Sequence, residues 1–134
     1  MMQAVLKQHL GAAFLVESAG VRKELAGRPA NYRSVACMKE RGVDLSSHIS
    51  RWIGDLDLDE YRWIVCVGHD EADQVRSALA QNSAATVMVA NEHHGGIPDP
   101  YEHGLAGYRD CLALLDRVMP HIAQHILGSG ICHC

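Results

Sequence analysis

Short apolar segments that alternate with amphipathic segments constrain the fold of this chain more than any other feature of its sequence. Residues 14–16, 63–67 and 86–89 are apolar runs with the length of buried strands. The segments between them place apolar residues at the three- and four-residue spacing of a helix face. Helices of this kind connect parallel strands and cover the sheet that the strands form. The sequence therefore predicts an α/β fold with a small parallel sheet and helices on both faces.

The amphipathic segments also predict where the helices lie. We expect helices at residues 2–10, 32–41, 70–79 and about 105–122, and a short acidic helix or turn at residues 55–60. Pro120 should kink or end the last helix, because proline removes a backbone donor. The alternation begins with a helix at Met2. We therefore expect that the strand which would precede this helix, the first strand of the sheet, is missing.

Length, charge and hydropathy bound the domain organisation and the partners. The chain has 134 residues, enough for one domain with its own core, which we place at residues 1–127, before a flexible Cys/His tail at residues 128–134. The net charge of -4 argues against nucleic acid as a partner, because nucleic acid requires a clustered basic surface. No apolar run approaches the ~20 residues of a membrane span, and the start lacks a signal-peptide pattern. We therefore expect a cytoplasmic protein with no membrane partner.

The chain has five cysteines, an odd number that argues against a disulfide framework in a protein without an export signal. Cys37, Cys66 and Cys111 have apolar neighbours, so we expect them in the core. The terminal Cys132-His133-Cys134 has side chains that suit Zn²⁺ or Cu⁺. Three consecutive residues do not easily surround one ion, however, so we favour a flexible tail and predict neither a metal nor a cofactor.

Asp99 is the residue with the clearest chemical use. It lies in an Ile-Pro-Asp-Pro-Tyr segment at residues 97–101, after the last predicted strand, and chemistry in open parallel sheets gathers in loops at this end of the strands. Pro98 and Pro100 restrict the backbone on both sides of it. A carboxylic acid on such a rigid loop can protonate a departing oxygen. Alternatively, the Asp-Pro pair is only a turn and N-cap signal.

Four segments together resemble a known family. Residues 97–101, together with the glycines that follow them, resemble the acid loop of low-molecular-weight protein tyrosine phosphatases. One class of arsenate reductases shares the fold of that family. We call residues 97–101 of this chain the acid loop. Residues 16–20, 42–51 and 63–67 match other segments of that family in the same order, and residues 2–6 resemble the start of its first helix. The resemblance covers the chain to about Ile126 and implies a low-molecular-weight phosphatase-like fold.

The resemblance assigns roles to four residues. It implies that Asp99 is the general acid, and that Tyr101, His48 and Arg51 contact the substrate. His48 and Arg51 have a second interpretation, as parts of a polar structural loop. Glu102 departs from the family pattern, because it replaces an aromatic residue and puts a carboxylate where a phosphate should approach.

The reaction of that family requires a Cys-x5-Arg loop between the first strand and the first helix, where the loop binds phosphate and a cysteine thiolate attacks phosphorus. Cys111 and Arg117 are the only pair in the chain with this spacing. They lie within the last predicted helix, in a segment without glycine, where the backbone N–H groups are committed to helix bonds. We therefore expect neither a phosphate loop nor a nucleophilic cysteine.

Three functions remain open at this point. The first is a non-catalytic relative of the phosphatases, which binds a phosphoprotein or a small anion. The second is an active phosphatase whose true start lies upstream of Met1. The third is a metal- or thiol-binding protein that uses Cys132-His133-Cys134. We also expect a homodimer, because the loss of a central strand would expose the edges of its neighbours.

Overall fold

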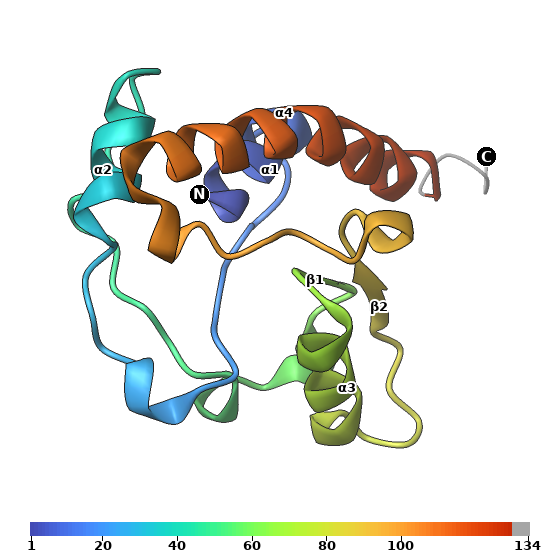
Figure 1. Ribbon diagram of the computed structural model, residues 1–134. Helices are drawn as coiled ribbons and strands as arrows, with labels where there is room; N and C mark the ends of the chain where they lie inside the picture. The colour runs from blue at the N-terminus through green and yellow to red at the C-terminus, as the bar shows by residue number, and fades with distance from the viewer. Residues whose placement is uncertain (130–134) are drawn as a thin grey trace. The chain divides into compact units, whose positions relative to one another are not determined.

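The computed structural model describes residues 1–129 and divides into two compact units. Unit 1 comprises Met1–Glu17, Ala30–Ser47 and the chain from Asp99 onward, and unit 2 comprises Ser18–Pro29 and His48–Pro98. Helices belong to both units, whereas the named strands belong to unit 2 (Figure 1). The chain is an α/β protein with a parallel sheet, as the sequence predicts.

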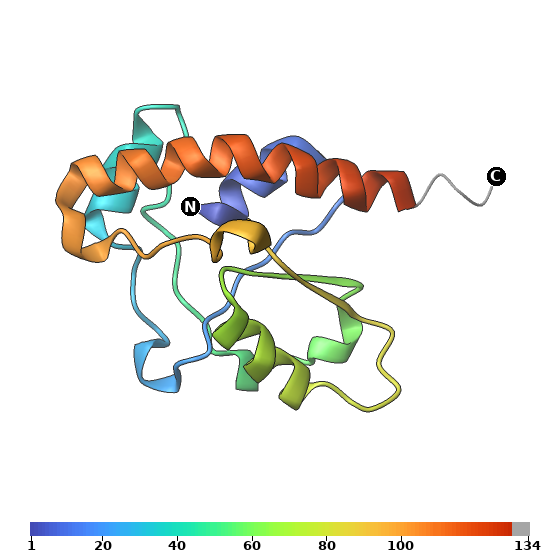
Figure 2. The ribbon, with the colours of Figure 1, turned by 45° about the vertical axis from the view of Figure 1, so that its right-hand side comes forward.

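The core of unit 1 is the buried face of helix α4 (Gly104–Ser129). Helices α1 (Met2–Leu10) and α2 (Tyr32–Lys39) pack against it, and both views show them beside α4 (Figure 1, Figure 2). The buried residues recur at helical spacing along α4, so one stripe of the helix forms the core. They are Tyr108, Leu112, Leu115, Met119, Ile122, Ala123 and Ile126 on α4, Val5 and Leu6 on α1, and Cys37 and Met38 on α2.

Two arginine–carboxylate pairs tie α4 to the end of α2. Arg41 donates through both terminal nitrogens to Asp116, at 2.7 Å from Nη1 to Oδ1 and 2.5 Å from Nη2 to Oδ2. Arg109 Nη2 lies 2.7 Å from Glu40 Oε1. All four side chains are partly exposed, so water screens their attraction. The two pairs connect the segment just after α2 to the exposed side of α4.

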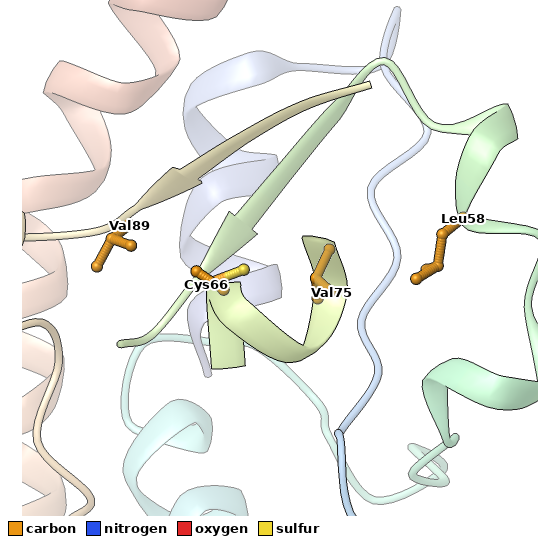
Figure 3. Packing of buried hydrophobic residues seen from close by; sticks show 5 residues of the cluster. Leu58, Cys66, Val75 and Val89 are labelled. Carbon is orange, nitrogen blue, oxygen red and sulfur yellow. The ribbon is translucent and has the colours of Figure 1, made fainter. Parts of the chain in front are cut away.

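Unit 2 is built on two parallel strands, β1 (Trp63–Cys66) and β2 (Thr86–Val89). Ile64 lies opposite Val87, and Cys66 lies opposite Val89. Helix α3 (His69–Ala78) connects the strands and packs on both of them. The apolar cluster that joins helix and strands consists of Leu58, Cys66, Ala72, Val75 and Val89 (Figure 3).

The prediction of a strand at residues 14–16 is wrong. These residues are irregular, and the side chain of Leu15 is 80% exposed. A strand exists only where a neighbour completes its hydrogen-bond ladder, and within residues 1–129 the named strands pair only with each other. The carbonyl of Val16 instead accepts a hydrogen bond from Gln3 Nε2 at 3.1 Å. An apolar run is therefore not enough to specify a strand.

The last helix does not end at Pro120. It continues to Ser129 with Pro120 inside it. Proline removes one helix bond at this point, but the neighbouring turns are anchored, because Met119 is fully buried and Ile122 and Ala123 are buried as well. Tertiary packing supplies most of the stability of helices in proteins, and here it outweighs the local preference.

The remaining differences concern boundaries. Residues 53–60 form two short 3-10 helices, Ile53–Asp55 and Leu58–Glu60, where a short acidic helix or turn was expected. Gly128 and Ser129 belong to α4, whereas Cys132-His133-Cys134 lies outside the described residues. Within residues 1–129, no helix combines the length and apolar character needed to cross a membrane. The single domain at residues 1–127 stays a prediction.

Candidate functional site

The loop that follows β2 is fixed to the end of β1 within unit 2. Ile97 donates its N–H to the carbonyl of Val67 at 2.7 Å. Asn91 holds the loop from the other side, because its carbonyl accepts from Gly96 N–H and its side-chain amide donates to Gly96 O, both at 3.0 Å. A Cβ atom on Gly96 would lie 2.2 Å from the Val67 carbonyl oxygen. Glycine is therefore required for this close approach.

Asp99 forms a tight turn at the start of the 3-10 helix Tyr101–His103. Its Oδ1 accepts a hydrogen bond from the backbone N–H of Tyr101 at 3.0 Å, and both side chains are exposed. This bond is the one expected if the Asp-Pro pair is a turn and N-cap signal. The bond engages one carboxylate oxygen, so the other can still face a ligand, and the structural and chemical roles of Asp99 are compatible.

Gly107 allows the acid loop to pack on the first turn of α4. A Cβ atom at this position would lie 2.3 Å from His103 Cβ and 3.3 Å from the carbonyl oxygen of Pro100. The first distance is shorter than any ordinary carbon–carbon contact. Glycine at position 107 is thus needed for the close packing of this turn.

Tyr108 lies where the charges of both Asp99 and Arg33 reach it, and the sequence did not single out Tyr108 or Arg33 as a site residue. Tyr108 is 5% exposed; its burial raises the pKa of the phenol, the negative charge of Asp99 raises that pKa further, and the positive charge of Arg33 lowers it. The Arg33 guanidinium also lies over the ring of Tyr32, 4.7 Å from its centre. Tyr108 was expected only as an apolar helix residue, and nothing in the sequence pattern marks Arg33.

His48 and Arg51 lie in unit 2, and Arg51 supports a loop there. Arg51 Nη2 donates to the carbonyl of Ser18 at 3.3 Å, and the Arg51 carbonyl accepts from Gly20 N–H at 2.8 Å. Burial lowers the pKa of His48, and the positive charge of Arg51 acts in the same direction. These bonds give Arg51 a structural task, which agrees with the second interpretation of this segment.

The structure thus joins the predicted site residues in two pairs. Asp99 and Tyr101 are hydrogen-bonded neighbours in unit 1. His48 and Arg51 are electrostatically coupled in unit 2. Their roles toward a substrate stay predictions.

None of the three described cysteines has the location and the lowered thiol pKa that a nucleophile needs. Cys111 and Arg117, the only pair with the Cys-x5-Arg spacing, both lie inside α4, as expected. Cys37 and Cys66 are buried in the cores of units 1 and 2. Burial raises the pKa of all three thiols, whereas a nucleophilic cysteine needs a lowered pKa.

Within residues 1–129, no group of three or more His, Cys, Asp or Glu side chains could hold a metal ion. The metal-site interpretation of Cys132-His133-Cys134 falls outside the described residues.

Comparisons with known proteins define the family. The sequence model of low molecular weight phosphotyrosine protein phosphatases matches residues 1–128. The chain belongs to this family, which confirms the resemblance of its motifs. The probable low molecular weight protein-tyrosine-phosphatase EpsP of Ralstonia solanacearum is 25% identical over 130 residues, which cover 97% of this chain and 88% of that protein.

Solved structures show the same fold. Primo-1 has a TM-score of 0.82 at 20% identity, with 94% of this chain and 88% of that chain covered. Wzb of Vibrio vulnificus, solved in complex with benzylphosphonate, has a TM-score of 0.77 at 23% identity, with 92% and 87% covered.

Proposed function

We propose that this 134-residue chain is a non-catalytic member of the family, which binds a phosphoprotein or a small anion at its acid loop and does not hydrolyse it. One observation carries the proposal. The only Cys-x5-Arg spacing in the chain lies inside α4, where the backbone N–H groups are used by the helix and cannot cradle a phosphate. A general acid cannot replace the missing nucleophile.

An assay with an aryl phosphate tests this proposal directly. We expect no hydrolysis by the chain, by Asp99→Asn or by Cys111→Ser. A rate that is equal in all three proteins identifies a contaminating enzyme. Hydrolysis that disappears with either substitution would overturn the proposal, because it would show that the acid or the thiol takes part in turnover.

Binding at the acid loop requires a separate measurement. Titration with a phosphotyrosine peptide should shift the backbone amide resonances of Asp99 and Tyr101, since both residues are exposed on this loop. The unphosphorylated peptide is the control. Equal shifts with both peptides, or none with either, would contradict the binding role while leaving the absence of catalysis untouched.

The coverage of the relatives favours a second candidate, an active phosphatase that is longer than this chain. The match to EpsP uses 97% of this chain but 88% of that protein, so part of the relative lies outside the match. The codons upstream of Met1 test this candidate. An in-frame strand followed by Cys-x5-Arg would support an active enzyme, and a stop codon directly upstream would exclude it.

The location and assembly of the protein complete the proposal. We propose a cytoplasmic homodimer. A sheet of two strands is marginal by itself, and the sheet of unit 2 has two strands within the described residues, so a second copy could extend it. Sedimentation should show a dimer at micromolar concentration. A compact monomer would contradict this assembly.

A further inference from the structure

Ser50 ties together two segments of unit 2 that lie far apart in the sequence. Its carbonyl accepts a hydrogen bond from Gly27 N–H, and its own N–H donates to the carbonyl of Arg28, both at 2.8 Å. The Ser50 hydroxyl donates to the carbonyl of Leu25 at 2.7 Å and accepts from Arg28 N–H at 3.0 Å. Residues 22–28 therefore form a loop with a fixed backbone, although most of them are exposed.

This loop carries more positive than negative charge. Arg22, Lys23 and Arg28 are exposed, and Glu24 is the only carboxylate among them, whereas the whole chain has a net charge of -4. Lys23 Nζ lies 5.1 Å from the centre of the Trp52 ring, so cation–π attraction favours this position of its charge. The loop thus differs in sign from the chain as a whole.

Two exposed aliphatic side chains accompany these charges. Leu25 is 38% exposed and Ile49 is 52% exposed. They belong to the two segments that Ser50 joins, because Ile49 precedes Ser50 and the Ser50 hydroxyl holds the carbonyl of Leu25. A ligand that matches this surface therefore combines negative charge with apolar side chains.

The aromatic residue of this surface is not open to a nucleic acid base. Bases stack on exposed aromatic faces. The Trp52 ring has Lys23 over it and lies against Gly54, where an added Cβ would be 2.3 Å from a ring atom. An acidic peptide segment fits the surface better than a nucleic acid.

Glu24 shows how a carboxylate binds here. Arg22 Nε donates to Glu24 Oε1 at 2.8 Å, and the side chains of this pair are 66% and 61% exposed. Water screens an ion pair with this exposure, so the pair is weak. A carboxylate of a partner can therefore take the place of Glu24 on Arg22.

We propose that this loop and its neighbour bind an acidic, partly apolar peptide segment of a partner protein, and that Glu24 competes with the carboxylates of that segment. We call the binding residues the basic surface; they are Arg22, Lys23, Leu25, Arg28 and Ile49. The proposal goes beyond the function proposed above, because the basic surface lies in unit 2 and its ligand needs no phosphate.

The experiment measures, by fluorescence anisotropy, the binding of the full chain to a labelled, unphosphorylated peptide of glutamate and leucine residues. A peptide of lysine and leucine residues of the same length is the control. We expect binding of the first peptide only, and we expect it to weaken as the salt concentration rises. Because the probe carries no phosphate, this binding and the proposed binding at the acid loop can fail independently.

Substitutions then locate the contact. Each of the variants Arg22→Gln, Lys23→Gln and Arg28→Gln should weaken binding about two- to fivefold, as for the loss of an exposed ion pair. Glu24→Gln should instead strengthen binding, because it removes the competing carboxylate. Arg62→Gln, which changes an exposed arginine of the same unit, should leave binding unchanged.

Three results would overturn the proposal. Equal binding of the two peptides would show that charge does not select the ligand. An equal weakening in Arg62→Gln and Arg28→Gln would show that the net charge of the chain is responsible and not this loop. Binding to phosphatidylserine vesicles without binding to the acidic peptide would assign the surface to a membrane. Far-ultraviolet circular dichroism verifies the fold of each variant, and Arg22→Gln replaces Arg28→Gln in the comparison if Arg28→Gln does not fold.

Discussion

The two pairs of candidate residues are held in place in different ways. In unit 1, the hydrogen bond of Asp99 reaches a residue two positions away. In unit 2, the hydrogen bond of Arg51 reaches a carbonyl 33 positions away. The first arrangement is determined by a Pro-Asp-Pro segment and its neighbours, and the second by the meeting of two distant loops. The position of Asp99 is therefore set by local sequence, whereas the position of Arg51 depends on contacts between distant segments.

The largest expected effect tests whether the acid loop can still perform chemistry. If the codons upstream of Met1 supply a strand and a Cys-x5-Arg loop, the longer protein should hydrolyse aryl phosphates. Asp99→Asn should then slow turnover by about 10²–10⁴-fold, the usual loss when a general acid is removed. Asp110→Asn, an exposed substitution of the same kind on α4, is the matched control. An unchanged rate in Asp99→Asn would show that the loop is only a turn.

The next effect concerns the packing of the acid loop on α4. Gly107→Ala would place a Cβ atom 2.3 Å from His103 Cβ, so the backbone of the 3-10 helix Tyr101–His103 must move. We expect a loss of about 1–3 kcal/mol in the free energy of unfolding, measured with urea, as for other overpacked sites. Gly128→Ala has nothing within 4 Å of the added atom, and it should cost nothing. Equal stability of the two variants would contradict the role of Gly107.

The loop of unit 2 should respond to the loss of its distant contact. Arg51→Met keeps most of the side-chain volume but removes the donor to Ser18 O. We expect a destabilisation of about 0.5–1.5 kcal/mol, typical of one hydrogen bond. Arg62→Met, an exposed arginine in the same unit, should change the urea midpoint little. If the two variants behave alike, the Arg51 bond does not support the loop.

The smallest effects are pH-dependent, and they fall in different pH ranges for the two units. Burial lowers the pKa of His48 in unit 2, so the unfolded chain takes up the proton first as the pH falls. The free energy of unfolding should have its full value above the pKa of His48 in the unfolded chain, about 6.5, and should decrease as the pH falls below it. His48→Gln should remove this slope from a plot of urea midpoint against pH.

Asp116 gives the corresponding test for unit 1. The hydrogen bond from Arg41 lowers the pKa of its carboxyl group, so its contribution is present above the unfolded pKa of about 3.9 and is lost as the pH falls through the folded value. Asp116→Asn should flatten the plot of urea midpoint against pH only in this acidic range. A change near neutral pH would show that a different group is responsible.

The sequence predicted the elements whose structure depends on their own residues. The bounds of α1 and β2 were as expected, because a helical stripe followed by Gly11 and a compact apolar run are local signals. The turn at Asp99 could also be predicted, since prolines and aspartate determine it locally. Features that distant contacts decide against the local pattern were not predicted. Residues 14–16 have no ladder partner in the described chain, Pro120 is held in a helix by packing, and the proximity of Arg33 to Tyr108 arises from the packing of α2 on α4.

The close approach at Gly96 has a consequence for how this chain can vary. Its backbone φ is +95° and an added Cβ would meet the Val67 carbonyl oxygen, so both conformation and space exclude every other amino acid. Gly128, by contrast, has open space around it. In a library that samples all substitutions, position 96 should therefore retain glycine alone among folded clones, and position 128 should accept many residues. The end of β1 thus limits the evolution of a loop that lies far from it in sequence.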